Sequence, residues 1–283
     1  MITLAFSTNA YTRFSLADAC DRIVAAGYRA VEVLADVPHA YPPTYDAHRA
    51  ARLNERLAAL GARAVAVNAN TAMGYWTPVP DTLTFEPSLV STDEVHREAR
   101  VGLIGQALAL ANRLAAPVVT ITTGRPPKGD DPAALWDRLL EGLDACLLLA
   151  DRAGVDLAIE PEPGQFIETS PDLKRLLETL DHPRLGANLD IGHAACAGED
   201  PAESVRLLGP RLRHLHLEDI KGREHYHLIP GLGDVDFHAV RAALHDVGYN
   251  RAAAVELYTY TAEPDRAAAE AHRALAPLFV DKA

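Results

Sequence analysis

The sequence is poor in cysteine and lacks a segment typical of secretion or of a membrane anchor. Its three cysteines, Cys20, Cys146 and Cys196, are widely spaced and odd in number, which excludes a disulfide framework and a zinc knuckle. The first residues lack a basic segment followed by an apolar stretch and a cleavage site. The longest apolar stretch, Val101 to Ala116, is interrupted by polar residues and is too short to span a bilayer. We therefore expect a cytoplasmic protein without a membrane partner.

Basic residues are scarce as well. The 283 residues include 27 Lys and Arg against 39 Asp and Glu, which gives a formal net charge of −12. A surface of that sign repels nucleic acids, so we expect no nucleic-acid partner. With 48% apolar and 23% charged residues, the composition is that of a folded globular protein, and the length allows one large domain or two ordinary ones.

Short apolar runs alternate with longer helical patterns along the whole chain. The eight expected strands are Thr3–Ser7, Ala30–Leu34, Ala64–Asn68, Val118–Thr122, Asp156–Glu160, Gly186–Asp190, Leu212–Leu217 and Ala253–Leu257. The expected helices are Ser15–Ala26, Ala47–Leu60, Thr92–Ala115, Pro132–Ala153, Pro171–Leu180, Pro201–Leu208, Phe237–Val247 and Pro264–Phe279. Eight consecutive βα units predict a single (β/α)₈ TIM-barrel domain over residues 1–283. A doubly wound open sheet is the competing fold, but no Gly-x-Gly-x-x-Gly follows the first strand.

Residues 71–91 form the longest irregular stretch, with Tyr75, Trp76 and three prolines. A loop of this length in a compact domain is usually a lid or a binding loop. We expect a lid whose Trp76 contacts a sugar-sized substrate. Packing of the lid on the barrel is the alternative.

Carboxylates and imidazoles follow several of the expected strands. Active sites of (β/α)₈ barrels lie at the carboxyl ends of the strands. Glu160, Asp190, His216 and Glu256 occupy such positions and together make a plausible cage for one divalent ion. Oxygen ligands with a single nitrogen favour Mn²⁺ first and Mg²⁺ next, with Co²⁺ and Zn²⁺ as alternatives. Each residue alone could instead form a structural ion pair, but several buried carboxylates without cations repel one another, and a metal ion neutralises them.

Several motifs together identify a family. They are Ile159-Glu160, Asp190-Ile-Gly-His193, His214-Leu-His216-Leu-Glu218-Asp219, Pro230-Gly231-Leu-Gly233 and Val255-Glu256. In these motifs, and over its whole length, the sequence resembles the xylose-isomerase-like TIM-barrel superfamily. That superfamily includes sugar isomerases, ketose 3-epimerases, hydroxypyruvate isomerase, inosose-metabolising enzymes and the three-zinc apurinic endonucleases. The resemblance implies that Glu160, Asp190, His216 and Glu256 share one metal, and that His193 contacts substrate.

The endonuclease branch of the superfamily carries two further zinc sites. One uses histidines from the third and fourth strand regions, where this chain has Asn68, Asn70 and two threonines, so that site is missing. The other uses the histidine of the Asp-x-x-His element and an Asp-x-His pair, which here reads His225-Tyr226-His227. A second metal therefore stays open, but we favour a substrate-binding role for His193, His225 and His227.

The epimerase branch carries a substrate-contacting glutamate shortly after the first ligand and an arginine after the histidine ligand. Glu162 takes the first role here, with Glu168 as competitor, and Arg223 takes the second, with Lys221 as competitor. The Glu160-Pro-Glu162 element departs from the epimerase pattern, which leaves the substrate undecided.

These observations predict a divalent-metal-dependent isomerase or epimerase of a ketose, keto-polyol or inosose-like substrate. Glu160 and Glu256 would transfer the proton on opposite faces of an enediolate. A zinc-dependent endonuclease-like hydrolase and a lyase or dehydratase acting on a keto-sugar are the alternatives. The expected partner is a small sugar or polyol without phosphate, because no Gly-rich phosphate cradle is evident; a homo-oligomer stays open.

Overall fold

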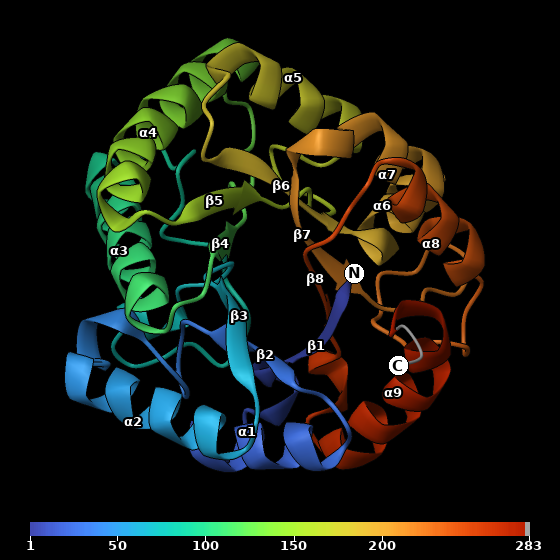
Figure 1. The fold of residues 1–283 in the computed structure, drawn as a ribbon. Helices are drawn as coiled ribbons and strands as arrows, with labels where there is room; N and C mark the ends of the chain where they lie inside the picture. Colours follow the sequence, from blue (N-terminus) through green and yellow to red (C-terminus); the bar gives the residue numbers. More distant parts are fainter. Residues whose placement is uncertain (281–283) are drawn as a thin grey trace.

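The apolar runs of the sequence fold into eight parallel strands that close into a barrel. The computed structural model describes residues 1–280 (Figure 1). The strands follow chain order, and β8 pairs with β1. They are β1 (Thr3–Ser7), β2 (Ala30–Leu34), β3 (Arg63–Asn68), β4 (Val118–Ile121), β5 (Asp156–Ile159), β6 (Leu185–Asp190), β7 (Leu212–Leu217) and β8 (Ala252–Val255). The predicted (β/α)₈ barrel is confirmed, and the strand limits differ from the predicted ones by at most two residues.

Helices cover the outside of the barrel. They are α1 (Leu16–Ala25), α2 (Ala47–Ala59), α3 (Glu94–Arg113), α4 (Pro132–Ala153), α5 (Ser170–Leu180), α6 (Ile191–Ala197), α7 (Pro201–Leu208), α8 (Phe237–Asp246) and α9 (Pro264–Phe279). Short 3₁₀ turns are η1 (Thr8–Tyr11), η2 (Pro42–Thr44), η3 (Met73–Tyr75), η4 (Gly209–Arg211) and η5 (Tyr258–Tyr260). The side chains of Ser15 and Asp200 cap α1 and α7. The short helix α6 was not predicted.

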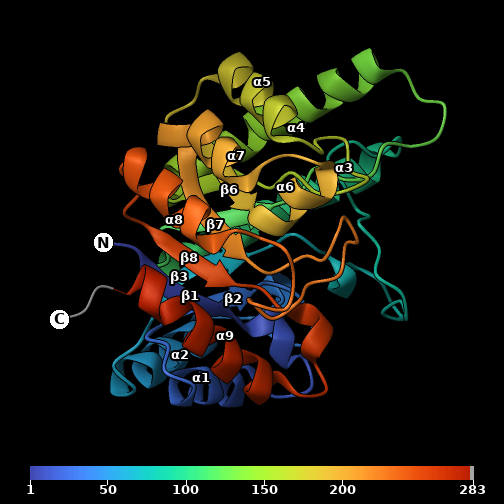
Figure 2. The same ribbon diagram turned by 90° about the vertical axis from the view of Figure 1, so that its right-hand side faces the viewer.

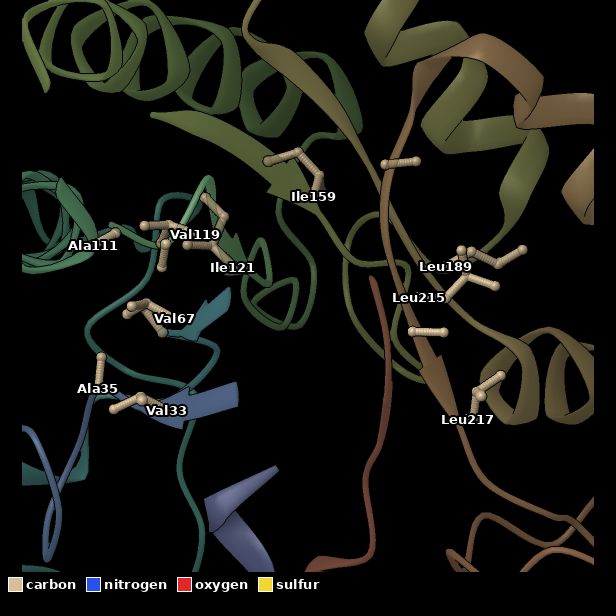
Figure 3. Packing of buried hydrophobic residues seen from close by; sticks show 14 of the residues in the cluster. Val33, Ala35, Val67, Ala111, Val119, Ile121, Ile159, Leu189, Leu215 and Leu217 are labelled. Atoms are coloured by element: carbon tan, nitrogen blue, oxygen red, sulfur yellow. The ribbon is translucent and has the colours of Figure 1, made fainter. Parts of the chain in front are cut away.

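The main hydrophobic core lies between the barrel and the helices. Alternate residues of a strand point to opposite faces, and the outward ones are mostly Val, Ile and Leu. Figure 3 shows part of this cluster, including Val67, Ile121 and Leu215. Inside the barrel the apolar residues are small, and they form two minor clusters around Ala5 and Ala158 that are separate from the main core.

The two ends of the barrel differ in the length of their connections. Figure 2 shows the long loops after β3 and β4 on the right, at the carboxyl ends of the strands, and both termini on the left. Residues 71–91 belong to the first of these loops and contain only η3 as regular structure. Among residues 1–280, no helix combines the length and the apolar character needed to cross a membrane.

Candidate metal and substrate site

Four predicted ligands come together at the carboxyl ends of four consecutive strands. Glu160 follows β5, Asp190 ends β6, His216 lies in β7 and Glu256 follows β8. All four side chains are buried, and one ligand atom from each lies within 4.8 Å of the others. Nδ1 of His216 is 3.2 Å from Oε1 of Glu160, 3.5 Å from Oε2 of Glu256 and 3.9 Å from Oδ2 of Asp190. The structure therefore brings the predicted set into one cluster.

Asp190 presents one free oxygen to this cluster. Its Oδ1 accepts hydrogen bonds from the backbone N–H groups of Gly192 (2.7 Å) and His193 (3.2 Å) and thereby caps α6. Its Oδ2 is buried and has no hydrogen-bond partner. Leaving a buried carboxylate oxygen unsatisfied is costly. A cation at the centre of the cluster would satisfy it.

Glu160 is held by two asparagine amides. Its Oε2 accepts from Nδ2 of Asn70 at 2.7 Å and from Nδ2 of Asn188 at 2.6 Å. Its Oε1 faces His216. One oxygen of the carboxylate is thus fixed by the protein, and the other remains free to bind a metal ion.

Glu256 is held in the same way. Its Oε1 accepts from Nδ2 of Asn9 and from Nδ2 of Asn68, both at 2.9 Å, while Oε2 is turned toward His216. The sequence analysis assigned no role to Asn9 and Asn188. It considered Asn68 and Asn70 only because they stand where the endonucleases have histidine ligands. The sequence did contain a signal for Asn188: it lies two residues before Asp190 and therefore on the same face of β6.

Behind His216 stands Glu32 of β2, which is fully buried. Its Oε2 is 2.9 Å from Nε2 of His214 and 2.9 Å from Nε2 of His216. Burial opposes ionisation of Glu32, but the charge of His216 and hydrogen bonds from both imidazoles hold its pKa well below the ordinary value. Because the Nε2–H of His216 donates to this carboxylate, a neutral His216 would present the lone pair of Nδ1 to the cluster, where a cation would take the place of the second ring proton.

Three further histidines meet beside the cluster. Nε2 of His225 is 3.0 Å from Nε2 of His193 and 3.3 Å from Nε2 of His227. The Nδ1 atoms of His193 and His227 face the carbonyl oxygens of Pro161 (3.1 Å) and Glu256 (2.9 Å). A carbonyl only accepts, so both Nδ1 atoms carry protons and a neutral ring presents an Nε2 lone pair. A proton or a metal ion must separate these lone pairs.

The carboxylates around His193 favour its protonation. Burial opposes protonation of His193, but the carboxylates of Asp190, Glu162 and Glu160 raise its pKa to about 9. Burial lowers the pKa of His225 to about 4 and that of His227 to about 3. His193 therefore donates its Nε2–H to His225 when no metal binds there.

Glu218, which the sequence motif contains but to which no role was assigned, lies beneath this trio. Its side chain is fully buried, and its carboxylate contacts the ring of His227. Burial raises the pKa of Glu218 well above the ordinary value. It packs so closely on Gly192 that a Cβ there would overlap its carboxylate, which explains the glycine after Asp190-Ile191.

A cavity of about 330 Å³ opens above the cluster, within the size range of small-molecule sites. Glu162, His193, His227 and Glu256 line it from below. Burial raises the pKa of Glu162 to about 7. The predicted lid contributes Thr71, Met73, Leu83 and Phe85, and the remaining lining residues are Asn9, Thr12, Leu34, Asp36, Val37, Asn68, Asn70, Tyr258 and Thr261. Its lining contains no Lys or Arg, which suits a neutral polyhydroxylated molecule.

Three predicted substrate contacts, Trp76, Arg223 and His225, do not line this cavity. The indole of Trp76 donates to the backbone oxygen of Glu86 (2.9 Å) and packs edge-on against Tyr75 and His96. Arg223 is exposed, and its Nε donates to the backbone oxygen of Cys196 (3.1 Å). Residue type alone singled out Trp76 in the loop, whereas the aromatic ring of this loop that lines the cavity is that of Phe85.

Comparisons with known proteins agree with this fold. The profile of the family described as "xylose isomerase-like TIM barrel" matches residues 20–278. Fructoselysine 3-epimerase of Shigella flexneri is 30% identical over 266 residues, which cover 89% of this chain and 90% of that protein. Inosose dehydratase of Clostridium perfringens is 28% identical over 131 residues, 40% of this chain and 44% of that protein. A structure of the IOLI protein with a bound zinc atom superposes with a TM-score of 0.80 at 17% identity, covering 99% of this chain and 100% of that one. The chain belongs to the xylose isomerase-like TIM-barrel family.

Proposed function

We propose that this protein is a divalent-metal-dependent epimerase or isomerase of a small ketose or keto-polyol. The observation that carries the proposal is the convergence of three carboxylates and one imidazole nitrogen on one point, with Oδ2 of Asp190 buried there without a partner. This point lies under a cavity of sugar size that has no cationic lining residue. Similarity to fructoselysine 3-epimerase over 89% of the chain supports the same activity class.

The donor set fits a divalent cation. Glu160, Asp190, His216 and Glu256 would hold it, and each glutamate would use the oxygen that its asparagine pair leaves free. Hard oxygen donors with one nitrogen favour Mn²⁺, with Mg²⁺, Co²⁺ and Zn²⁺ as alternatives. Such an ion would supply positive charge beside the substrate carbonyl, which acidifies the adjacent C–H bond and stabilises the resulting negative charge.

In this proposal the two glutamates move the proton. Glu160 and Glu256 follow β5 and β8, which are three strands apart in the barrel, so they approach the centre from different sides. In the proposed reaction one carboxylate removes the proton from the carbon beside the carbonyl, and the other returns a proton to the opposite face. Return to the same carbon inverts it, and return to the neighbouring carbon interconverts aldose and ketose.

The remaining residues of the cavity bind and shield the substrate. His193 and His227 offer ring nitrogens to substrate hydroxyl groups, and Glu162 offers a carboxyl group of raised pKa that can donate or accept a proton. Leu83 and Phe85 of the loop present apolar surface over the opening, where they would exclude water from the deprotonated intermediate.

A dehydratase is the second candidate, supported by the similarity to inosose dehydratase over 40% of the chain. The same base would remove the proton beside the carbonyl. An acid such as Glu162 or protonated His193 would then give its proton to the hydroxyl group on the next carbon, which leaves as water. Endonuclease chemistry is less well supported, because Asn68 and Asn70 donate their amides to Glu256 and Glu160 where the endonucleases have metal ligands.

A single experiment separates these candidates. The purified protein is analysed for bound metal and is then incubated in D₂O with a panel of ketoses and inososes, followed by ¹H NMR. An epimerase places deuterium at one carbon with inverted configuration, and a dehydratase yields an unsaturated ketone or diketone. Protein treated with EDTA serves as the control. If the metal-loaded protein exchanges no substrate proton and releases no water from any member of the panel, the proposal is wrong.

A further inference from the structure

One buried arginine lies outside the cavity and outside the residues assigned so far. Arg100 belongs to α3, and its side chain is buried. Within residues 1–280, its guanidinium group donates only to backbone oxygens: Nη2 to those of Ala69 (2.7 Å) and Asn70 (3.4 Å), and Nη1 to that of Thr71 (3.4 Å). Burial lowers the pKa of Arg100 to about 10, so the group is still charged at neutral pH. A buried cation is costly unless its donors are satisfied, so these three carbonyl groups tie the side chain to one short segment.

This short segment leads from the barrel into the metal and substrate site. It follows the end of β3, and its central residue, Asn70, donates Nδ2 to Oε2 of Glu160 at 2.7 Å. The backbone oxygen of Asn70 also accepts from Oγ1 of Thr122 at 3.0 Å. Arg100 and Thr122 therefore hold the backbone from which the amide reaches Glu160.

The two amides that orient Glu160 are anchored in different ways. Asn188 lies inside β6, which pairs with β7, so the hydrogen bonds of the barrel fix its position. Asn70 lies two residues beyond Asn68, where the pairing of β3 ends. Side chains hold its backbone oxygen instead of a strand. Without them, one of the two hydrogen bonds that turn Oε1 of Glu160 toward His216 would lose its fixed geometry.

The lid has an anchor of its own. Oδ2 of the buried Asp36 accepts from Oγ1 of Thr71 at 2.6 Å and from the N–H of Met73 at 2.7 Å. Thr71 and Met73 both line the cavity. Loosening Arg100 should therefore disturb the orientation of Glu160 more than the wall against which substrate binds, and should lower kcat more than it raises KM.

We propose that Arg100 and Thr122 are positioning residues: they fix the backbone of Asn70, and Asn70 in turn orients the carboxylate of Glu160. The inference rests on the proposed function, because it concerns the part of Glu160 in metal binding and proton transfer. Displacement of a reacting group by about 1 Å can cost on the order of 10²-fold in rate. The planar fork of an arginine holds successive carbonyl oxygens in a way that the single ammonium group of a lysine does not reproduce. Arg100→Lys therefore keeps the charge and loosens Asn70.

The test is a double-mutant cycle between Arg100→Lys and Asn70→Ala, with kcat and KM measured on the metal-loaded protein and the ketose or inosose of the panel that turns over fastest. Thr122→Val, which removes the other bond to the oxygen of Asn70, is cycled in the same way and carries the test if Arg100→Lys does not fold. Arg97→Lys is the matched control. Arg97 lies three residues earlier on α3, and its Nη1 donates to the backbone oxygens of Ser91 (2.9 Å) and Thr92 (3.2 Å) at the other end of the loop.

A second measurement needs neither metal nor substrate. The side-chain amide of Asn70 gives a pair of signals in the ¹H–¹⁵N NMR spectrum, identified by their loss in Asn70→Ala. Their exchange with D₂O reports whether Nδ2 stays bound to Glu160. We expect this exchange to be about tenfold faster in Arg100→Lys, the effect of losing one hydrogen bond, and unchanged in Arg97→Lys.

In the cycle, Arg100→Lys should lower kcat by about 10–100-fold with a smaller change in KM, and Thr122→Val should lower it less. Neither should lower kcat further once Asn70 is alanine, and Arg97→Lys should leave kcat unchanged. Effects that multiply in the cycle, an equal loss in Arg97→Lys, or unchanged exchange of the Asn70 amide would each overturn the inference. If the wild type turns over no member of the panel, the proposed function fails, and the amide exchange alone decides on Arg100.

Discussion

The two ends of the barrel are built from the same eight strands and carry opposite charges. Buried carboxylates surround the carboxyl end of the barrel and the interior beneath it, among them Glu32, Asp36, Glu160, Glu162, Asp190, Glu218 and Glu256. The amino-terminal mouth, where the strands begin, is lined by Arg63, Arg213 and Arg251, and Asp156 forms ion pairs with the last two. The His214–Glu32–His216 bridge lies between them. Strand geometry alone gives the barrel its two open ends. The residues at each end decide which ligand that end can bind.

The largest effect is expected from a change at the carboxyl-terminal mouth, Glu256→Gln. The amide would keep an acceptor for Asn9 and Asn68, but it would offer neither a base nor a metal-binding oxygen toward His216. Loss of general acid–base catalysis costs about 10²–10⁴-fold in rate. Turnover and solvent-deuterium uptake should both fall by that factor, with Glu270→Gln, a partly exposed glutamate outside the cavity, as control. Near-normal proton exchange in Glu256→Gln would remove this residue from the mechanism.

The second largest effect is expected from removal of the metal. The buried carboxylates would then face one another without a neutralising ion, and the folded state would lose the binding free energy. At a free metal concentration of a thousand times Kd, metal binding contributes about 4 kcal/mol to the free energy of unfolding. Its loss corresponds to a fall in Tm of about 10 °C for a domain of this size. Thermal unfolding with and without EDTA measures it. The variant Asp190→Asn should lose most of this difference, and an unchanged Tm in the wild type would argue against a bound metal.

The barrel and the positions of its four proposed ligands could be predicted from the sequence because both depend on local patterns. Apolar runs define strands, and the residue that follows each run marks the carboxyl end, as with Glu160 and Glu256. The asparagine pairs could not be predicted in the same way, because Asn9 contacts Glu256 across 247 positions of the chain. Arg223, Trp76 and His225 were expected to contact substrate, but they do not line the cavity. The direction of a loop side chain depends on contacts that no periodicity encodes.

A smaller effect is expected in the bridge between the two mouths. Glu32→Gln would remove the negative charge that faces Nε2 of His216. The side-chain amide of the new glutamine would also lie against Nδ2 of Asn68, which donates to Glu32 in the wild type. Partners of this kind commonly contribute 10–100-fold to metal affinity. We expect metal binding weakened by at least about tenfold in competition calorimetry, with circular dichroism to show that the fold is kept. Unchanged affinity would mean that Glu32 only fills space.

His227→Ala examines whether the histidine trio holds substrate or a second metal. With one metal per chain, loss of this ring should leave the metal content unchanged and raise KM by about tenfold, the contribution of one hydrogen bond to a charged or buried group. Native mass spectrometry gives the metal stoichiometry, and steady-state kinetics gives KM. Two ions in the wild type that fall to one in the variant would instead assign His193, His225 and His227 to a second metal site.

The smallest effect is expected at the amino-terminal mouth, from Arg63→Gln. Arg63 is exposed at the start of β3 and makes a single side-chain hydrogen bond, to Thr3, so its charge contributes little to the fold. Exposed substitutions of this type change the free energy of unfolding by less than about 0.5 kcal/mol. Metal affinity and turnover should also stay unchanged, because the side chain has no contact with the bridge to His216. Urea unfolding and metal titration measure the two quantities on one preparation. A loss of stability well above this limit would mean that the arginines of the amino-terminal mouth stabilise the fold, and the charge contrast between the two ends would then have a structural cause.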